Sequence, residues 1–131
     1  MSDSEVITAA LEQVADRAGD VTEAIFTRYF DRCSGSRALM DHTDEYMRGR
    51  MMTQVLLLFM EPGDSELKSY LDFETESHKA YGVLPHMYEN LLAAVREEVA
   101  DVLNGSFTPD IDAAFRSRID HLLSEIRKAG A

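Results

Sequence analysis

Cysteine, long apolar runs and targeting signals are scarce in this sequence of 131 residues, and each shortage excludes a class of protein. The single cysteine, Cys33, cannot form an internal disulfide, so the chain needs no oxidising compartment. The longest apolar run, residues 55–60, is far shorter than the roughly 20 residues that span a bilayer. The acidic N-terminus lacks the apolar core of a secretion signal. We therefore expect a soluble, cytoplasmic protein.

Positively charged residues are also in the minority. The chain has 24 Asp and Glu against 13 Lys and Arg, and its formal net charge is −11. No cluster of basic residues interrupts this acidity, and such a surface repels both a phosphate backbone and an anionic membrane. We expect no nucleic-acid partner and no membrane partner, and solubility is the simplest role of the charge.

Helix-forming residues, by contrast, are abundant and spaced for helices. Hydrophobic residues make up 45% of the chain, with only three Pro and seven Gly, which is typical of a folded protein. No stretch shows the alternating pattern of a strand. A length of 131 residues suits one domain with one core. The sequence therefore predicts a single all-α domain over residues 1–131.

Caps and helix breakers predict three helices in the first part of the chain. Their expected bounds are a cap at Ser2, Asp3 or Ser4 to about Arg17, then residues 21–32, then a cap at Asp41 or Thr43 to a stop at Pro62. Aromatic residues form a stripe on the second of these, which indicates core packing. Apolar residues surround the second half of the third helix, so we expect it to be buried between layers.

Three more helices are expected in the rest of the chain. Residues 65–78 form a short, weakly amphipathic segment. Pro85 suits the first position of a long helix that reaches about Leu103 and is closed by Asn104-Gly105. Thr108 and Pro109 are a strong signature for the start of the last helix.

The stretch between these segments carries the most specific chemistry. His78 ends the weak helix, and Gly82-Val83 precedes the Pro85 helix start. A neutral imidazole at such a position can offer one ring nitrogen to a metal while a neighbouring acceptor holds its other N–H. Alone, a histidine in a helical protein is more often structural or exposed than a ligand. The surrounding residues therefore have to show whether His78 is a metal ligand or a structural residue.

That pattern resembles the globin family, in particular single-domain bacterial haemoglobins and flavohaemoglobins, over about residues 5–128. The most specific likeness is His78 with Gly82-Val83 four and five residues later and Tyr88 ten residues later, as in the family's proximal-histidine segment. A second likeness covers residues 21–39, including the spacing of the second helix's aromatic residues. The resemblance implies a globin-like fold of six to eight helices around a haem pocket. It also implies haem b (iron protoporphyrin IX), with His78 as the metal ligand.

The resemblance further implies which residues surround the haem. The candidate cofactor-binding residues are Phe26, Met40, Arg48, Met52, Tyr81, Val83 and Tyr88. Two of them depart from the family's pattern. Phe26 stands where bacterial haemoglobins commonly carry a tyrosine that donates to the bound ligand, and Tyr29 lies one helical turn further on. Met40 stands where a phenylalanine usually stacks on the haem.

The distal helix allows two registers. If Gly49 marks a close helix crossing, Arg48 takes the ligand-side position and Met52 lies over the iron; we prefer this register because an arginine at a close crossing is hard to bury. In the other register Met47 and Met51 take those places.

Both registers give a pocket poor in neutral hydrogen-bond donors. Arg48 can donate to the bound ligand or pair with a haem propionate, the commoner fate of a long cation at a pocket mouth. The sixth iron position is either open or filled by Met47, Met51, Met52 or His42.

The predicted function is therefore binding of a diatomic gas (O2, NO or CO) at a haem iron, for gas sensing, transport or NO handling. No catalytic constellation is supported by spacing, and we expect NO dioxygenation only with an external reductase as redox partner. A homodimer remains open. The alternatives are a haem-free globin-like interaction or signalling module, or an electron-transfer haem protein with a second internal axial ligand.

Overall fold

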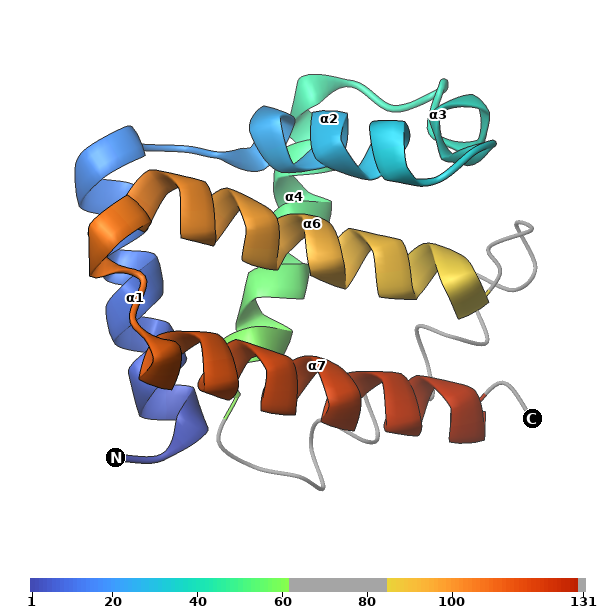
Figure 1. The fold of residues 1–131 in the computed structure, drawn as a ribbon. Helices are drawn as coiled ribbons and strands as arrows, with labels where there is room; N and C mark the ends of the chain where they lie inside the picture. Colours follow the sequence, from blue (N-terminus) through green and yellow to red (C-terminus); the bar gives the residue numbers. More distant parts are fainter. Residues whose placement is uncertain (62–84, 130–131) are drawn as a thin grey trace.

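The computed structural model describes residues 1–61 and 85–129 (Figure 1). Within these two ranges the chain is helical and has no strand. The elements are α1 (Asp3–Ala18), α2 (Thr22–Arg32), α3 (Ser36–Leu39), α4 (Glu45–Met60), α6 (Pro85–Leu103), a 3-10 turn η1 (Asn104–Ser106) and α7 (Pro109–Ala129). The all-α prediction is confirmed for this part of the chain. The expected helix over residues 65–78 and the candidates His78, Tyr81 and Val83 lie outside the described residues.

Side-chain caps explain where α1 begins. The Ser2 hydroxyl accepts from the Glu5 backbone N–H at 3.2 Å, and the Glu5 carboxylate accepts from the Ser2 backbone N–H at 3.3 Å. This reciprocal pair satisfies two N–H groups that a helix start leaves without partners. Gly19 ends the helix with a φ of 68°, a conformation that favours glycine. The predicted cap among residues 2–4 is confirmed.

The cap of α4 differs from the prediction. Neither Asp41 nor Thr43 holds this position; the Asp44 carboxylate accepts from the Met47 backbone N–H at 2.8 Å. Thr43 has another role, because its hydroxyl donates to the Met40 carbonyl oxygen at 2.6 Å and closes the turn before the helix. The expected cap residues are therefore wrong by one to three positions.

The two long helices at the end of the chain follow the predicted bounds. α6 covers Pro85–Leu103, and Asn104 then takes a left-handed conformation with a φ of 47°. The Arg17 guanidinium donates to the Leu103 carbonyl oxygen at 3.0 Å and so caps the end of α6. The Thr108 hydroxyl accepts from the Ile111 N–H at 3.2 Å at the start of α7.

The long helices form two crossing layers around one core. Figure 1 shows α2, α6 and α7 as neighbouring rows, with α4 crossing behind them. α6 packs against α1, α2 and α7, while α4 packs against α1, α2 and α7. The largest side chains that are almost completely buried are Phe26, Phe59, Phe115, Ile7, Ile25, Met52, Leu103 and Leu122.

The burial of α4 is less complete than expected. Met52 and Phe59 are its two buried residues, whereas Met47 is 39% exposed and Leu57 is 52% exposed. Apolar residues surround this helix, yet its packed neighbours cover one side of it better than the other. The prediction that α4 is enclosed between layers is therefore wrong for the side that carries Leu57.

Candidate functional site

Two of the candidate haem-contact residues lie deep in the core. Phe26 on α2 and Met52 on α4 each expose 1% of their surface. The Phe26 ring stacks on Phe30 with 6.0 Å between centroids and meets Tyr29 edge-on at 6.4 Å. These offset and T-shaped arrangements are the ones aromatic rings prefer. The aromatic stripe predicted for the second helix is thus largely core, as its spacing indicates.

Two further candidates pack against the same core from the side. Met40, at the end of α3, and Tyr88, on the first turns of α6, are partly buried and contact the cluster that contains Phe26 and Met52. Phe26 and Met52 thus belong to the apolar core that the described helices share, and Met40 and Tyr88 pack against it. The remaining proximal candidates belong to the part of the chain that lies outside the described ranges.

Tyr29 adds a polar group to this apolar region. Its side chain is buried, and burial raises the pKa of its hydroxyl, with Cys33 and Tyr88 raising it further. The Tyr29 hydroxyl therefore stays protonated, and can donate, at any physiological pH. The sequence offered Tyr29 only as an alternative to Phe26, because helical spacing alone does not show which of two neighbouring aromatic residues meets Tyr88.

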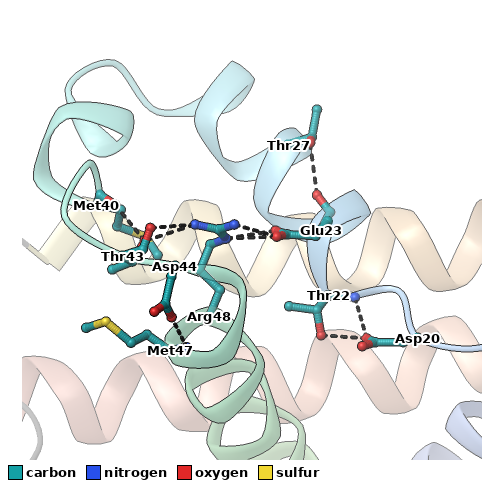
Figure 2. Close-up of polar contacts among 9 residues, drawn as sticks. All are labelled: Asp20, Thr22, Glu23, Thr27, Met40, Thr43, Asp44, Met47 and Arg48. Carbon is teal, nitrogen blue, oxygen red and sulfur yellow. Dashed lines mark hydrogen bonds and ion pairs between the residues drawn. The ribbon is translucent and has the colours of Figure 1, made fainter.

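Arg48 lies at the edge of this region in a fully occupied polar cluster (Figure 2). Its Nε donates to both Glu23 carboxylate oxygens at 3.0 and 2.9 Å, and its Nη2 donates to Glu23 Oε1 at 2.6 Å. Its Nη1 donates to the Thr43 carbonyl oxygen at 2.8 Å. The hydrogen bonds that Arg48 donates to Glu23 raise the pKa of Arg48, which stays charged. We call Glu23, Thr43 and Arg48 the corner clamp.

The neighbouring turns hold the partners of the clamp in place. On α2, the Asp20 carboxylate accepts from the Thr22 N–H at 2.9 Å and from its hydroxyl at 2.6 Å, which lowers the pKa of Asp20 and fixes the helix start just before Glu23 (Figure 2). On the other side, the hydrogen bonds of Thr43 and Asp44 fix the start of α4. The clamp thus joins the first turns of α2 and α4 through Glu23 and Arg48, which are 25 residues apart in sequence.

The sequence predicted a ligand or a haem propionate as the partner of Arg48, and the structure gives it Glu23 and Thr43. No periodic pattern connects residues on two different helices, so this pairing had no sequence signal. A carboxylate in the first turn of α2 is a common feature, whereas the helix macrodipole does not favour an arginine near the start of α4.

The two registers of the distal helix differ in burial. Met52 is buried and Met47 is 39% exposed, while the preferred register with Arg48 and Met52 stays a prediction. The reason given for that register is wrong, however. Over residues 1–61 and 85–129, no atom lies within 4 Å of a β-carbon built on Gly49, so Gly49 does not mark a close crossing of the described helices.

The candidates for an internal sixth ligand are spread over different environments. His42 is exposed on the turn before α4, and Met47 faces largely outward. Met51 is half-buried, and Met52 is the member of this set that lies inside the core. Among the described residues, no three His, Cys, Asp or Glu side chains form a group that could hold a metal ion.

Some of the described candidates have side chains of the types that contact a porphyrin. Such a group needs apolar and polarizable contacts on its faces and a cation near its carboxylates. Phe26, Met40 and Met52 are of the first type, whereas the cation Arg48 is already paired with Glu23. A haem iron in addition needs one axial ligand, for which the sequence offers His78.

The chain matches no protein-family model and no curated protein among those with which it was compared. Over residues 1–61 and 85–129, no helix combines the length and the apolar character that a membrane crossing requires.

Proposed function

We propose that this chain is a haem-binding globin that binds a diatomic gas at an iron held by His78. The observation that carries the proposal is that Phe26 and Met52 belong to the apolar core and that Met40 and Tyr88 pack against it. These residues are 62 positions apart at the extremes, and the resemblance to globins implies a haem contact for each of them. A cofactor that contacts all four would have to lie in this core.

The helix packing supports the same proposal. α2 packs on α6, α1 on α7, α6 on α7, and α4 crosses α1 and α2. Helices that pack in pairs across one another, with the cofactor between facing helices, are how the globin fold builds its haem pocket. Haem bound here would supply an iron that binds O2, NO or CO reversibly, while Phe26 and Met52 exclude water from the bound gas.

The test is haemin titration of the purified protein, followed by its absorption spectrum. We expect a Soret band from the wild type at one haemin per chain and its loss or a strong shift in His78→Ala. The matched control is His86→Ala, because His86 is an exposed histidine on α6 and its loss should leave the spectrum unchanged. Equal haemin binding by the wild type and His78→Ala would reject His78 as the ligand.

A second candidate function is favoured by one observation. Phe26 and Met52 are already enclosed by protein, with 1% of their surfaces exposed. Enclosure of this kind suits a haem-free globin-like module that acts through protein contacts. This candidate predicts a colourless protein after haemin addition and a fold that His78→Ala leaves intact. The same titration therefore separates the two functions.

A further inference from the structure

The chain between α2 and α4 buries little of its own surface. We call residues 34–43 the corner strap; it contains α3 and lies at the end of α2 (Figure 1). Ser36 is its one buried residue, and Leu39 and Met40 are half-buried against the core. A segment that buries so little apolar surface gains little free energy from staying in place.

The backbone hydrogen bonds of the corner strap are local. The Ser36 N–H donates to the Cys33 carbonyl oxygen at 3.2 Å, and the Thr43 N–H donates to the Met40 carbonyl oxygen at 3.0 Å. Bonds between such close neighbours move with the segment, so they do not hold it against the helices. Because α2 and α4 pack directly against each other, the two ends of the strap stay in place when its middle detaches.

Two side-chain contacts fasten the corner strap to the flanking helices. At one end, the Arg37 guanidinium lies over the Phe30 ring of α2, 4.7 Å from the ring centroid. At the other end, Arg48 of α4 donates from Nη1 to the Thr43 carbonyl oxygen at 2.8 Å and to the Thr43 hydroxyl at 3.3 Å. Each contact thus holds one end of the strap.

Glu23 keeps Arg48 in the position that this second contact needs. Nε and Nη2 of Arg48 both donate to the Glu23 carboxylate, which leaves Nη1 directed at Thr43. The Arg48 side chain is 20% exposed and that of Glu23 is 52% exposed, so ions in the solvent weaken the pair. The strength of this fastening therefore depends on the surrounding solution.

We infer that the corner strap opens as a unit while α2 and α4 stay folded, and that the ion pair of Glu23 and Arg48 is the latch that limits this opening. Glu23 is a positioning residue, because it acts on the strap through Arg48. Opening admits solvent and small molecules to the end of α2, where Cys33 adjoins the strap and is 2% exposed. The inference does not depend on haem binding.

The experiment measures how fast an uncharged maleimide reacts with Cys33, the single cysteine of the chain, in the folded protein. We expect the reaction to be about three- to tenfold faster in Glu23→Ala than in the wild type, the effect of one charge-assisted contact at a partly exposed site. Glu23 and Cys33 are roughly 15 Å apart along the helix, beyond the Debye length of about 8 Å, so a direct effect of the charge on the thiol is screened.

A second pair of variants tests whether Glu23 acts through Arg48. Arg48→Leu should accelerate the reaction at least as much as Glu23→Ala does, because it removes the contact with Thr43 as well. Adding Glu23→Ala to Arg48→Leu should then change nothing further, since the two residues share one interaction. Raising the salt concentration should bring the wild-type rate closer to that of Glu23→Ala.

Glu12→Ala is the matched control, because Glu12 is an exposed carboxylate on α1. It should react at the wild-type rate. The urea dependence of the wild-type rate separates local opening from global unfolding. At low urea the rate should rise much less steeply than the equilibrium constant of global unfolding, because opening the strap exposes less surface.

Three results would overturn the inference. A wild-type rate with the full urea dependence of global unfolding would exclude opening of the strap alone. Equal rates for the wild type and Glu23→Ala would exclude the latch. A further acceleration when Glu23→Ala is added to Arg48→Leu would show that Glu23 does not act through Arg48. None of these results bears on haemin binding, which the titration above measures separately.

Discussion

Two regions of the molecule are held together by different forces. Between α6 and α7 lies a buried apolar core, whose residues with less than 2% exposure include Val95, Val99, Phe115 and Leu122. At the corner where α2, α3 and the start of α4 meet, the contacts are hydrogen bonds among Glu23, Thr43 and Arg48 (Figure 2). Only Ser36 is buried between Gly35 and Met51.

The difference between the two regions indicates which contacts can rearrange at low cost in stability. Apolar packing is close to all-or-none, because a displaced core side chain leaves a cavity. A surface-edge ion pair contributes little net stability and can be exchanged for another partner. Few buried contacts are a mark of the less stable parts of a protein, and the corner has few of them. The candidate site lies between the two regions, with Phe26 and Met52 on the rigid side and Arg48 on the adaptable side.

The largest effect should come from the apolar region. Phe115 on α7 is fully buried and meets the Phe59 ring at 5.6 Å, so Phe115→Ala removes an aromatic contact that joins α4 to α7. We expect a loss of about 3–5 kcal/mol in the free energy of unfolding, measured by urea denaturation. Leu57→Ala is the control: this exposed leucine should change stability by about 0.5 kcal/mol or less. Equal losses of unfolding free energy in Phe115→Ala and Leu57→Ala would contradict the contrast between the buried core and the exposed residues.

An intermediate loss of stability is expected when an ion pair between α2 and α6 is removed. Arg28 is 30% exposed and donates from Nε to Glu98, whose side chain is 12% exposed, at 2.8 Å. Arg28→Ala leaves that carboxylate half-desolvated and without this partner, and should cost about 1–2 kcal/mol. Lys128→Ala removes an exposed cation of α7 and should cost about 0.5 kcal/mol or less. A cost for Arg28→Ala as small as that of Lys128→Ala would contradict the account.

A gain in stability should follow at the corner. Gly49 lies inside α4, and a β-carbon there meets nothing within 4 Å. Gly49→Ala should therefore raise the free energy of unfolding by about 0.5–1 kcal/mol, because alanine loses less backbone entropy in a helix. Differential scanning calorimetry or urea unfolding measures it. A loss of stability would show that another helix does approach Gly49 closely.

The smallest effect concerns alkaline pH. Burial raises the pKa of Tyr29 in the folded protein above its ordinary value of 10.0. The unfolded chain then releases the proton first, so Tyr29 contributes to stability below about pH 10 and this contribution is lost as the pH rises toward the folded pKa. When the pH is raised from about 8 to about 11, the free energy of unfolding, measured with urea, should fall less for Tyr29→Phe than for the wild type. Equal losses would mean that the Tyr29 hydroxyl is solvated.

Local sequence signals predicted the helices well. The Ser2 cap, the Pro85 start and the Thr108-Pro109 start each depend on neighbours within four residues, so the sequence shows them directly. The cap of α4 was missed because Asp41, Thr43 and Asp44 are all good cap residues. Only the tertiary position of Thr43, between Met40 and Arg48, decides among them.

The candidate site was predictable in composition but not in pairing. Phe26 and Met52 could be chosen by likeness and spacing, and both lie in the core. The partner of Arg48 could not be predicted, because Glu23 reaches it across an α2 and α4 contact that no periodicity encodes. Gly49 shows the reverse error: a glycine in a helix suggested a close crossing, and the space around it is open.

The most direct test of the haem proposal is the absorption spectrum of the wild-type protein, purified after expression with haem supplied, in its ferric, ferrous and CO-bound forms. The proposal predicts a red protein with a Soret band that shifts when CO is added to the ferrous form. A colourless protein whose spectrum is that of tyrosine and phenylalanine alone, before and after addition of haemin, would contradict it.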